Sequence, residues 1–254
     1  MHKNTKIVLL GLGKVGRELV RQVNASGRDF AFTALADSSA FVGGAPLTAE
    51  QMETALEIKD NGGSLTDLAA AQPLAQLAQH YQPGTLLVDC SAARSLALDA
   101  ALRSGVKLVF ANKNTLSAPW PAAAAFFNND QVGYEATVGA GLPVIQTLRT
   151  LLNTGDSVLH IQGVMSGTLG FLCSQLEQGA TYSQAVQQAF EAGYTEPDPR
   201  DDLSGFDVLR KALILARSAG WPLEKEHFTV EALYDESLAN LPVAHFFAKM
   251  HTLD

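Results

Sequence analysis

The first half of the chain alternates short apolar runs with segments whose hydrophobic residues recur at helical spacing. The apolar runs are nearly continuous in hydrophobic residues, which is typical of strands buried on both faces of a sheet. They lie at residues 6–10, 30–36, 85–89 and 106–110. Helices are expected at residues 15–24, after the Thr-Ala-Glu-Gln capping box at residues 48–51, and from Pro73. This alternation predicts a doubly wound parallel sheet.

The pattern changes near residue 131, where strands and helices no longer alternate regularly. A strand is expected at residues 133–138, a helix from Pro143, and another strand at residues 158–164. Further helices are expected at about residues 168–178, 183–192 and 204–219, with Gly193 and Gly220 at the positions of C-terminal caps. We therefore expect one domain over residues 1–130 and a second, α+β domain over residues 131–254.

Composition and charge restrict the class of protein. The chain has 254 residues, of which 47% are hydrophobic and 17% are charged, as in a globular protein with a sizeable core. No apolar run is long enough to cross a bilayer, so no membrane association is expected. A net charge of −8 without clustered Lys and Arg argues against a nucleic-acid partner. Two cysteines are too few for a disulfide framework, and we expect a cytoplasmic protein.

Three glycines between the first strand and the first helix fit the pattern G-x-G-x-x-G. Gly11 permits a tight turn, Gly13 lets the backbone approach a pyrophosphate, and Gly16 lets helix and strand pack closely. The segment predicted to bind NAD or NADP consists of Gly11, Leu12, Gly13, Lys14, Val15 and Gly16. The first domain is then a Rossmann-type domain, and the alternative is a turn with a structural role only.

Asp37 ends the second predicted strand, about 20 residues after the last glycine, which is where a carboxylate can accept hydrogen bonds from the adenosine ribose. A carboxylate there would repel a 2′-phosphate, and residues 38–42 contain no Lys or Arg to bind one. This modestly favours NAD over NADP. The alternative is an exposed loop aspartate that contacts nothing.

Two further polar residues follow predicted parallel strands at their carboxyl ends, where open α/β sheets place their ligands. Ser91 follows the strand at residues 85–89, and Lys113 follows the strand at residues 106–110. Lys113 can pair with a substrate carboxylate or the cofactor, or polarise a reacting oxygen. The alternative is an ordinary surface lysine.

Residues 193–202 form the most unusual segment, because two prolines stiffen a loop in which acidic side chains crowd together. Its acids include Glu196, Asp201 and Asp202, and a solvated acidic loop is one interpretation. The next helix places Asp207 and Lys211 one turn apart on the same face. One interpretation of that pair is an ordinary surface ion pair. The other is that the proton of the lysine is available to a developing alkoxide, while the nearby carboxylates bind a substrate ammonium.

These segments, taken together and in order along almost the whole chain, closely resemble homoserine dehydrogenase. They are residues 11–16, 88–91, 112–114, 134–143, 163–170 and 193–217. The resemblance implies an oxidoreductase with a Rossmann domain followed by an α+β substrate and dimerisation domain, acting as a homodimer. The implied reaction is reversible hydride transfer between a nicotinamide cofactor and the L-aspartate 4-semialdehyde/L-homoserine pair, in threonine and methionine biosynthesis.

The resemblance also assigns roles at the matching positions. Lys211 is implied as the acid–base lysine that protonates the carbonyl oxygen as hydride arrives, and Lys113 as a neighbour of the nicotinamide and the reacting oxygen. Glu196 and Asp207 are implied to hold the amino end of the substrate, with Asp201 and Asp202 as supporting acids. Ser91 corresponds to a position that contacts the cofactor. A monovalent cation such as sodium is implied on the main-chain oxygens of Glu135, Val138, Ala140 and Leu142.

One departure from the family concerns the C-terminal end. In the family the chain normally adds strands to the substrate domain and returns through a Gly-rich turn to complete the nucleotide domain, whereas this sequence ends at Asp254. We therefore expect a second domain that is incomplete at its C-terminus. The competing hypothesis is a non-catalytic or truncated NAD(P)-binding homologue, against which the presence of Glu196, Asp207, Lys113 and Lys211 argues.

Overall fold

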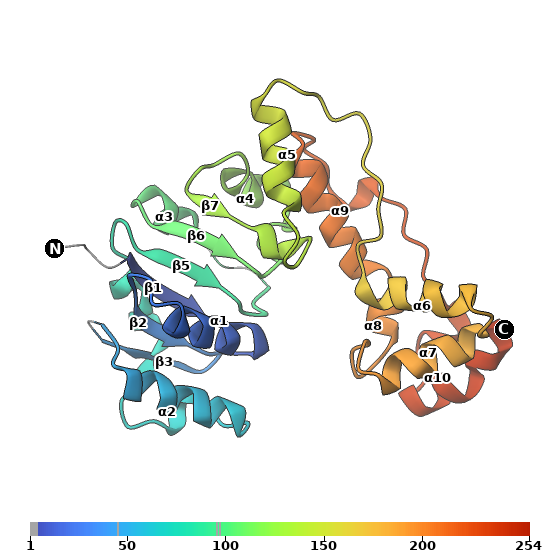
Figure 1. Cartoon of the computed structure of the whole chain (residues 1–254), viewed down its shortest axis with the longest axis horizontal. Coiled ribbons are helices and arrows are strands. Elements are labelled where there is room, and N and C mark those ends of the chain that lie inside the picture. Colours follow the sequence, from blue (N-terminus) through green and yellow to red (C-terminus); the bar gives the residue numbers. More distant parts are fainter. Residues whose placement is uncertain (1–4, 45, 95, 97) are drawn as a thin grey trace. The chain divides into compact units, whose positions relative to one another are not determined.

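Seven strands in the first part of the chain form one sheet (Figure 1). The computed structural model describes residues 5–44, 46–94, 96 and 98–254, which divide into unit 1 (Met1–Gln146) and unit 2 (Thr147–Asp254). The strand order is β4-β3-β2-β1-β5-β6-β7. The bounds are β1 Thr5–Leu10, β2 Phe30–Ala36, β3 Ala40–Gly43, β4 Gln72–Pro73, β5 Leu86–Asp89, β6 Lys107–Phe110 and β7 Val132–Gly133.

The doubly wound sheet that the sequence predicts is confirmed, and it contains two strands that were not predicted, β3 and β4. Parallel pairing joins β2 to β1, β1 to β5, β5 to β6 and β6 to β7. The sequence pattern missed β3, which runs antiparallel to both β2 and β4. A tight turn allows this reversal, because the Asp37 N–H donates to the Ala40 carbonyl at 3.0 Å and antiparallel strands need only a short connection.

One helix of unit 1, Ala49–Asp60, begins at a polar capping signal that the sequence predicts. The predicted capping box is confirmed: Thr48 Oγ1 accepts from the Gln51 N–H at 3.2 Å, and Gln51 Oε1 accepts from the Thr48 N–H at 2.9 Å. The helix expected from Pro73 is a 3₁₀ segment, η2 (Leu74–His80). The α-helices are α1 Lys14–Ala25, α2 Ala49–Asp60, α3 Asp99–Arg103 and α4 Trp120–Ala123, and the other 3₁₀ segments are η1 Leu65–Asp67, η3 Ala124–Phe126 and η4 Glu135–Thr137.

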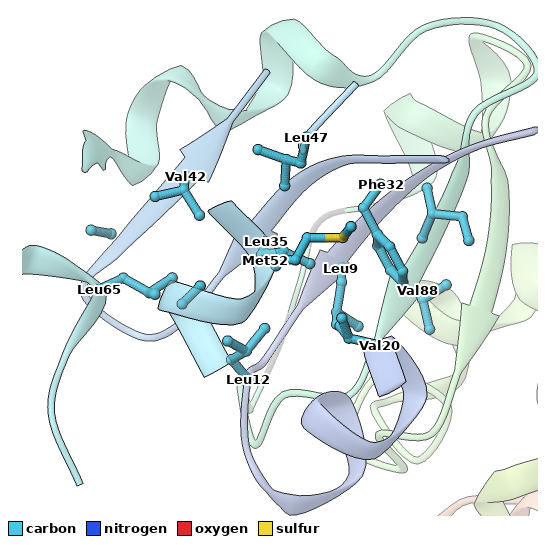
Figure 2. Packing of buried hydrophobic residues seen from close by; sticks show 13 residues of the cluster. Leu9, Leu12, Val20, Phe32, Leu35, Val42, Leu47, Met52, Leu65 and Val88 are labelled. Atoms are coloured by element: carbon cyan, nitrogen blue, oxygen red, sulfur yellow. The ribbon is translucent and has the colours of Figure 1, made fainter. Parts of the chain in front are cut away.

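The core of unit 1 lies between the sheet and the helices beside it (Figure 2). Leu9 of β1 and Leu35 of β2 are fully buried and pack with Val20 of α1 and Met52 of α2. Burying each such side chain contributes roughly 1.5–3 kcal/mol. This packing therefore holds α1 and α2 against the strands whose ends carry the candidate site residues.

Unit 2 consists of helices and turns in its described residues. The elements are α6 Gly167–Glu177, α7 Tyr182–Glu191, α8 Arg200–Leu203, α9 Phe206–Ser218, α10 Val243–Lys249, η5 Lys225–His227, η6 Glu236–Leu238 and η7 Met250–Leu253. A separate core joins α6, α7, α8 and α10 around Leu172, Val186, Leu203 and Phe246. The predicted helix at residues 204–219 begins instead at Phe206, because Gly205 adopts a left-handed φ of +74° before it.

Two predicted strands are wrong in whole or in part. Of the strand expected at residues 133–138, only Gly133 lies in β7, and η4 begins two residues later. No strand forms at residues 158–164, where Leu159 and Val164 are 90% and 78% exposed. An extended segment becomes a strand only with a hydrogen-bonding neighbour, and the described residues of unit 2 supply none. The α+β composition expected for the second domain is therefore not found in them.

Two remaining features concern the limit between the units and possible membrane spans. Helix α5 (Val144–Asn153) crosses the limit between unit 1 and unit 2. The functional limit expected near residue 130 stays a prediction.

Among the described residues no helix combines the length and apolar character that a bilayer span requires.

Asp37 connects the end of β2 to three other segments of unit 1. Oδ1 accepts from the Ser39 and Ala40 N–H groups at 2.8 and 3.0 Å, and Oδ2 accepts from Lys59 Nζ and the Leu65 N–H at 3.0 and 2.9 Å. The side chain is 6% exposed, so the interpretation as an exposed aspartate without contacts is wrong. Burial by itself raises the pKa of Asp37, but the hydrogen bonds from Leu65, Ser39, Lys59 and Ala40 lower it to about 2.

We predict that Asp37→Asn destabilises unit 1 in a pH-dependent manner. Lowering the pKa from 3.8 to about 2 corresponds to about 2 kcal/mol of stability at neutral pH. Because the folded-state pKa is the lower one, this stability is fully present above the unfolded-state pKa and is lost as the pH falls from 4 toward 2. Urea unfolding of both proteins between pH 7 and pH 2.5 measures the difference. Asp130→Asn, at an exposed carboxylate, is the control, and a difference that does not change with pH would contradict the prediction.

Candidate functional site

The glycine motif lies at the carboxyl end of β1, where the strand order of the sheet reverses. Gly11 has a φ of +91°, and a Cβ atom there would lie 2.5 Å from the Ser91 Cα. A Cβ atom on Gly16 would lie 2.0 Å from the Gly11 carbonyl oxygen. Gly13 is the N-cap of α1, and a Cβ atom built on it meets nothing within 4 Å. The turn and packing roles assigned to Gly11 and Gly16 therefore have a steric basis, and the backbone at Gly13 is open to a ligand.

The first turn of α1 suits an anionic group. Its N-cap provides no side-chain acceptor, so side-chain capping does not satisfy the N–H groups of the first turn. Aligned peptide dipoles and these N–H groups favour phosphate at a helix N-terminus. Leu12, between the first two glycines, is fully buried, whereas Lys14 and Val15 are exposed.

Neighbouring strands bring the other predicted cofactor residues of unit 1 to this same edge. Leu10 of β1 pairs with Asp89 of β5, and Asp89 pairs with Phe110 of β6. The segments that begin at Gly11, Cys90 and Ala111 therefore leave the sheet side by side (Figure 1). The open-sheet rule places ligands at this edge, at the reversal of strand order.

Asp89 joins two of these segments, and the sequence analysis did not identify it as a functional residue. Its Oδ1 accepts from Ser91 N and Ser91 Oγ at 2.9 and 2.6 Å, and its Oδ2 accepts from Asn112 Nδ2 at 3.1 Å. The residue is 1% exposed, and this burial raises the pKa of Asp89 above its usual range although the hydrogen bonds act in the opposite direction. The signal in the sequence was a charged residue ending an otherwise apolar strand.

Lys113 lies between two asparagines that tie its loop to the loop after β5. Asn112 Nδ2 donates to the Ala93 carbonyl at 2.9 Å, and Asn112 Oδ1 accepts from the Asn114 N–H at 2.9 Å. Asn114 Nδ2 also donates to the Ala93 carbonyl at 3.2 Å. Lys113 itself is half-buried. Its main chain is therefore held on both sides, unlike that of an ordinary surface lysine.

The residues implied to bind a cation lie on one turn after β7. Glu135 is in η4, and its carboxylate accepts from the Ile145 and Gln146 N–H groups at 2.8 and 2.9 Å, so it caps α5. Ala140 has a left-handed φ of +52°, which marks a sharp change of chain direction. The implied donors are neutral main-chain oxygens, and hard cations prefer oxygen. The chemistry of this donor set thus fits a monovalent cation. The described residues contain no cluster of His, Cys, Asp and Glu side chains suited to a metal.

In unit 2, helix α9 carries the predicted Asp207–Lys211 pair. Lys211 Nζ lies 2.8 Å from Asp207 Oδ2 and donates to the Met165 carbonyl at 2.7 Å. Asp207 Oδ1 also accepts from Arg210 at 3.0 Å. The side chains of Lys211 and Asp207 are 16% and 32% exposed, so the pair is more enclosed than a typical surface ion pair. The ammonium group is consequently held by two acceptors from different segments.

The acidic loop before α8 is held in place by a carboxylate of that helix. Asp202 Oδ2 accepts from the Glu196 N–H at 2.8 Å, and Asp202 Oδ1 lies 3.1 Å from Thr168 Oγ1. Thr168 Oγ1 also lies 2.7 Å from the Tyr194 carbonyl oxygen. Glu196 and Asp201 are exposed. Asp202 therefore fixes the backbone of the loop, while Glu196 and Asp201 present carboxylates to solvent.

Arg200 anchors the other end of this loop, a role that the sequence analysis missed. Its Nη2 lies 2.6 Å from Asp198 Oδ2, and its Nη1 donates to the Leu238 and Ala239 carbonyls at 3.0 and 2.8 Å. The guanidinium carbon lies 5.3 Å from the centre of the Phe246 ring. The hydrogen bond from Arg200 lowers the pKa of Asp198. The loop is thus attached to the segment before α10 as well as to α6.

Comparisons with known proteins agree with this geometry. Residues 143–251 match the family model of homoserine dehydrogenase. The chain is 41% identical over 229 residues to a homoserine dehydrogenase of Emericella nidulans, which covers 82% of this chain and 61% of that protein. It is 43% identical over 183 residues to a bifunctional aspartokinase/homoserine dehydrogenase 2 of Zea mays, which covers 69% of this chain and 20% of that protein.

A solved structure gives the same result for the fold. A hyperthermophilic archaeal homoserine dehydrogenase in complex with NADPH superposes with a TM-score of 0.68 at 25% identity, covering 85% of this chain and 69% of that one. The chain spans only a fifth of the maize relative and about three fifths of the fungal one. The sequence and structure matches therefore agree that this chain is similar to homoserine dehydrogenases over most of its length.

Proposed function

We propose that this chain catalyses the reversible, NAD(P)-dependent interconversion of L-homoserine and L-aspartate 4-semialdehyde. The observation that carries the proposal is the Lys211 ammonium, which Asp207 and the Met165 carbonyl hold at 2.8 and 2.7 Å on a half-enclosed face of α9. A proton donor fixed in this way is what a carbonyl reduction requires, because negative charge develops on the carbonyl oxygen. The similarity to homoserine dehydrogenases supports the same reaction.

The proposed mechanism assigns a separate role to each of Lys211, Lys113 and Asp207. The nicotinamide, when bound, supplies hydride in one direction and accepts it in the other. Lys211 donates a proton to the aldehyde oxygen during reduction and accepts the hydroxyl proton during oxidation. Lys113 is a neighbour of the nicotinamide in this proposal, and its positive charge accelerates the reaction if it stabilises the transition state more than the ground state. Asp207 orients Lys211 through their ion pair.

The acidic loop of unit 2 supplies the binding site for the amino acid in this proposal. Glu196 and Asp207 bind the substrate ammonium, and Asp201 and Asp202 support them. The exposed carboxylate of Glu196 on a loop fixed by Asp202 supports this role, because a positioned acceptor loses little conformational freedom on binding. Asp202 acts here through its hydrogen bond to the Glu196 backbone.

The cofactor site in this proposal comprises residues 11–16 and Ser91 at the edge of the sheet. Asp37 is proposed to lie near the adenosine ribose, but its four hydrogen bonds already use the acceptor positions of a carboxylate. Lys59 also neutralises its charge at 3.0 Å. We therefore propose that both NAD and NADP are used, with only a small preference for NAD.

The proposal also includes a bound cation, an oligomeric state and a cellular location. The main-chain oxygens of Glu135, Val138, Ala140 and Leu142 would hold a monovalent cation such as sodium, which would stabilise the turn after β7 electrostatically. The working form is proposed to be a homodimer in the cytoplasm, and the two cysteines, both free, fit a reducing compartment. Light scattering measures the oligomeric state.

Lys211→Ala is predicted to lower kcat for homoserine oxidation by about 10²–10⁴-fold, the usual contribution of a positioned acid–base group. The dissociation constant of the cofactor is expected to stay unchanged, because residues 11–16 and Ser91 are unaltered. Steady-state assays at 340 nm and cofactor fluorescence titrations provide these two measurements.

Lys249→Ala is the matched control, because this lysine is exposed in the last turn of α10 in the same unit. Wild-type kcat in Lys211→Ala would show that the role assigned to Lys211 is wrong. Cofactor binding without any homoserine oxidation by the unaltered chain would instead support the non-catalytic homologue.

The ratio of kcat/KM with NAD to that with NADP is predicted to be less than about ten, which corresponds to less than about 1.4 kcal/mol. The physical reason is that Lys59 pairs with Asp37, so the carboxylate repels a 2′-phosphate only weakly. Parallel assays with both cofactors at low salt measure the ratio. A preference for NAD above about 100-fold would show that Asp37 discriminates despite its internal hydrogen bonds.

A further inference from the structure

We propose that Asp89 is a positioning residue for the nicotinamide end of the cofactor site. Its carboxylate sets the relative placement of Ser91 on the loop after β5 and of Lys113 on the loop after β6. The inference rests on the proposed dehydrogenase function, and it concerns a residue that does not itself contact the substrate.

The position of Asp89 in the sheet makes this role possible. It is the last residue of β5 and pairs on one side with Leu10, directly before Gly11, and on the other with Phe110, directly before the loop that contains Lys113. Its carbonyl oxygen also accepts from the Ala111 and Asn112 N–H groups at 2.9 and 3.1 Å. Asp89 therefore contacts the loop after β6 through both its main chain and its side chain.

The chemistry of the contacts requires a carboxylate. Three donor groups converge on it, namely Ser91 N, Ser91 Oγ and Asn112 Nδ2, at 2.9, 2.6 and 3.1 Å. A carboxylate accepts at both oxygens, whereas an amide of the same shape presents one NH₂ group to these donors. Burying a charge at 1% exposure is costly, and a buried ion is weak evidence for stability alone. A carboxylate at position 89 is better explained by its role in placing the loops after β5 and β6 relative to each other.

The arrangement extends from Asp89 to Lys113 through two asparagines. Asn112 receives its orientation from Asp89 Oδ2 and the Ala93 carbonyl, and in turn accepts from the Asn114 N–H. Lys113 lies between these two residues, so a change at Asp89 alters the placement of Lys113 and Ser91 together. None of these contacts involves Lys211, Asp207 or Glu196 of unit 2.

The test is Asp89→Asn, which keeps the shape of the side chain and removes one acceptor. The loss of one charge-assisted hydrogen bond corresponds to a change of about ten-fold in an equilibrium or rate constant. We expect the dissociation constant of NADPH to rise by about ten-fold and kcat to fall by about ten-fold, while KM for homoserine changes by less than about three-fold. Fluorescence titration and steady-state kinetics are performed well below the melting temperature of each variant, which is measured by circular dichroism.

Asp99→Asn is the matched control, because Asp99 lies on α3 of the same unit and pairs with exposed Arg103 at 2.8 Å. It is expected to leave cofactor binding and kcat unchanged. If Asp89→Asn does not fold, Asn112→Ala removes the same connection from the other side and is expected to give the same split between kcat and KM.

Three results would overturn the proposal. The first is wild-type cofactor affinity and kcat in the folded variant, and the second is a lower melting temperature alone, which would indicate a structural role only. The third is an equal loss in KM for homoserine, which would indicate general disorder. If the unaltered chain does not oxidise homoserine, the proposed function fails, yet a ten-fold weaker affinity of Asp89→Asn for NADPH would still support the placement of the cofactor loops.

Discussion

The close approach of Gly11 to the backbone after β5 is the constraint on which unit 1 depends. A Cβ atom at this position would lie 2.5 Å from the Ser91 Cα. The backbone there has a φ of +91°, which residues other than glycine rarely adopt. The contact exists because β1 lies between β2 and β5, where the strand order reverses. The loops after β1 and β5 are therefore in close contact, and the residues of unit 1 proposed to bind the cofactor share one edge of the sheet.

Carboxylates organise the loops around both groups of candidate residues. Asp37, Asp89, Glu135 and Asp202 each accept hydrogen bonds from main-chain N–H groups of a neighbouring segment. The hydrogen bonds to Asp37, Asp89 and Glu135 are partly buried, and a donor that loses its acceptor where water cannot reach it costs roughly 1–3 kcal/mol. The acidic excess of the chain is therefore only partly available to a substrate ammonium, because several acids act within the protein as acceptors.

Local patterns predicted the fold wherever a few neighbouring residues decide the structure. The capping box at Thr48 starts α2, and the glycine motif lies between β1 and α1 as its spacing indicates. Prediction failed where the outcome depends on distant partners. Residues 158–164 include four β-branched or aliphatic residues, but the described residues of unit 2 contain no strand to pair with them. The strand β3 was missed because it depends on pairing with β2 and β4.

The sequence by itself determined the doubly wound sheet, the glycine turn, the Asp207–Lys211 spacing and the family resemblance, because these features depend on periodicity and on short motifs. Only the tertiary structure decided how each carboxylate is used. It showed Asp37 satisfied by four donors, Asp89 joining two loops, and Asp202 bound to the loop that carries Glu196. The physical reason is that hydrogen-bond partners are chosen by proximity in space, and the spacing along the chain carries no information about it.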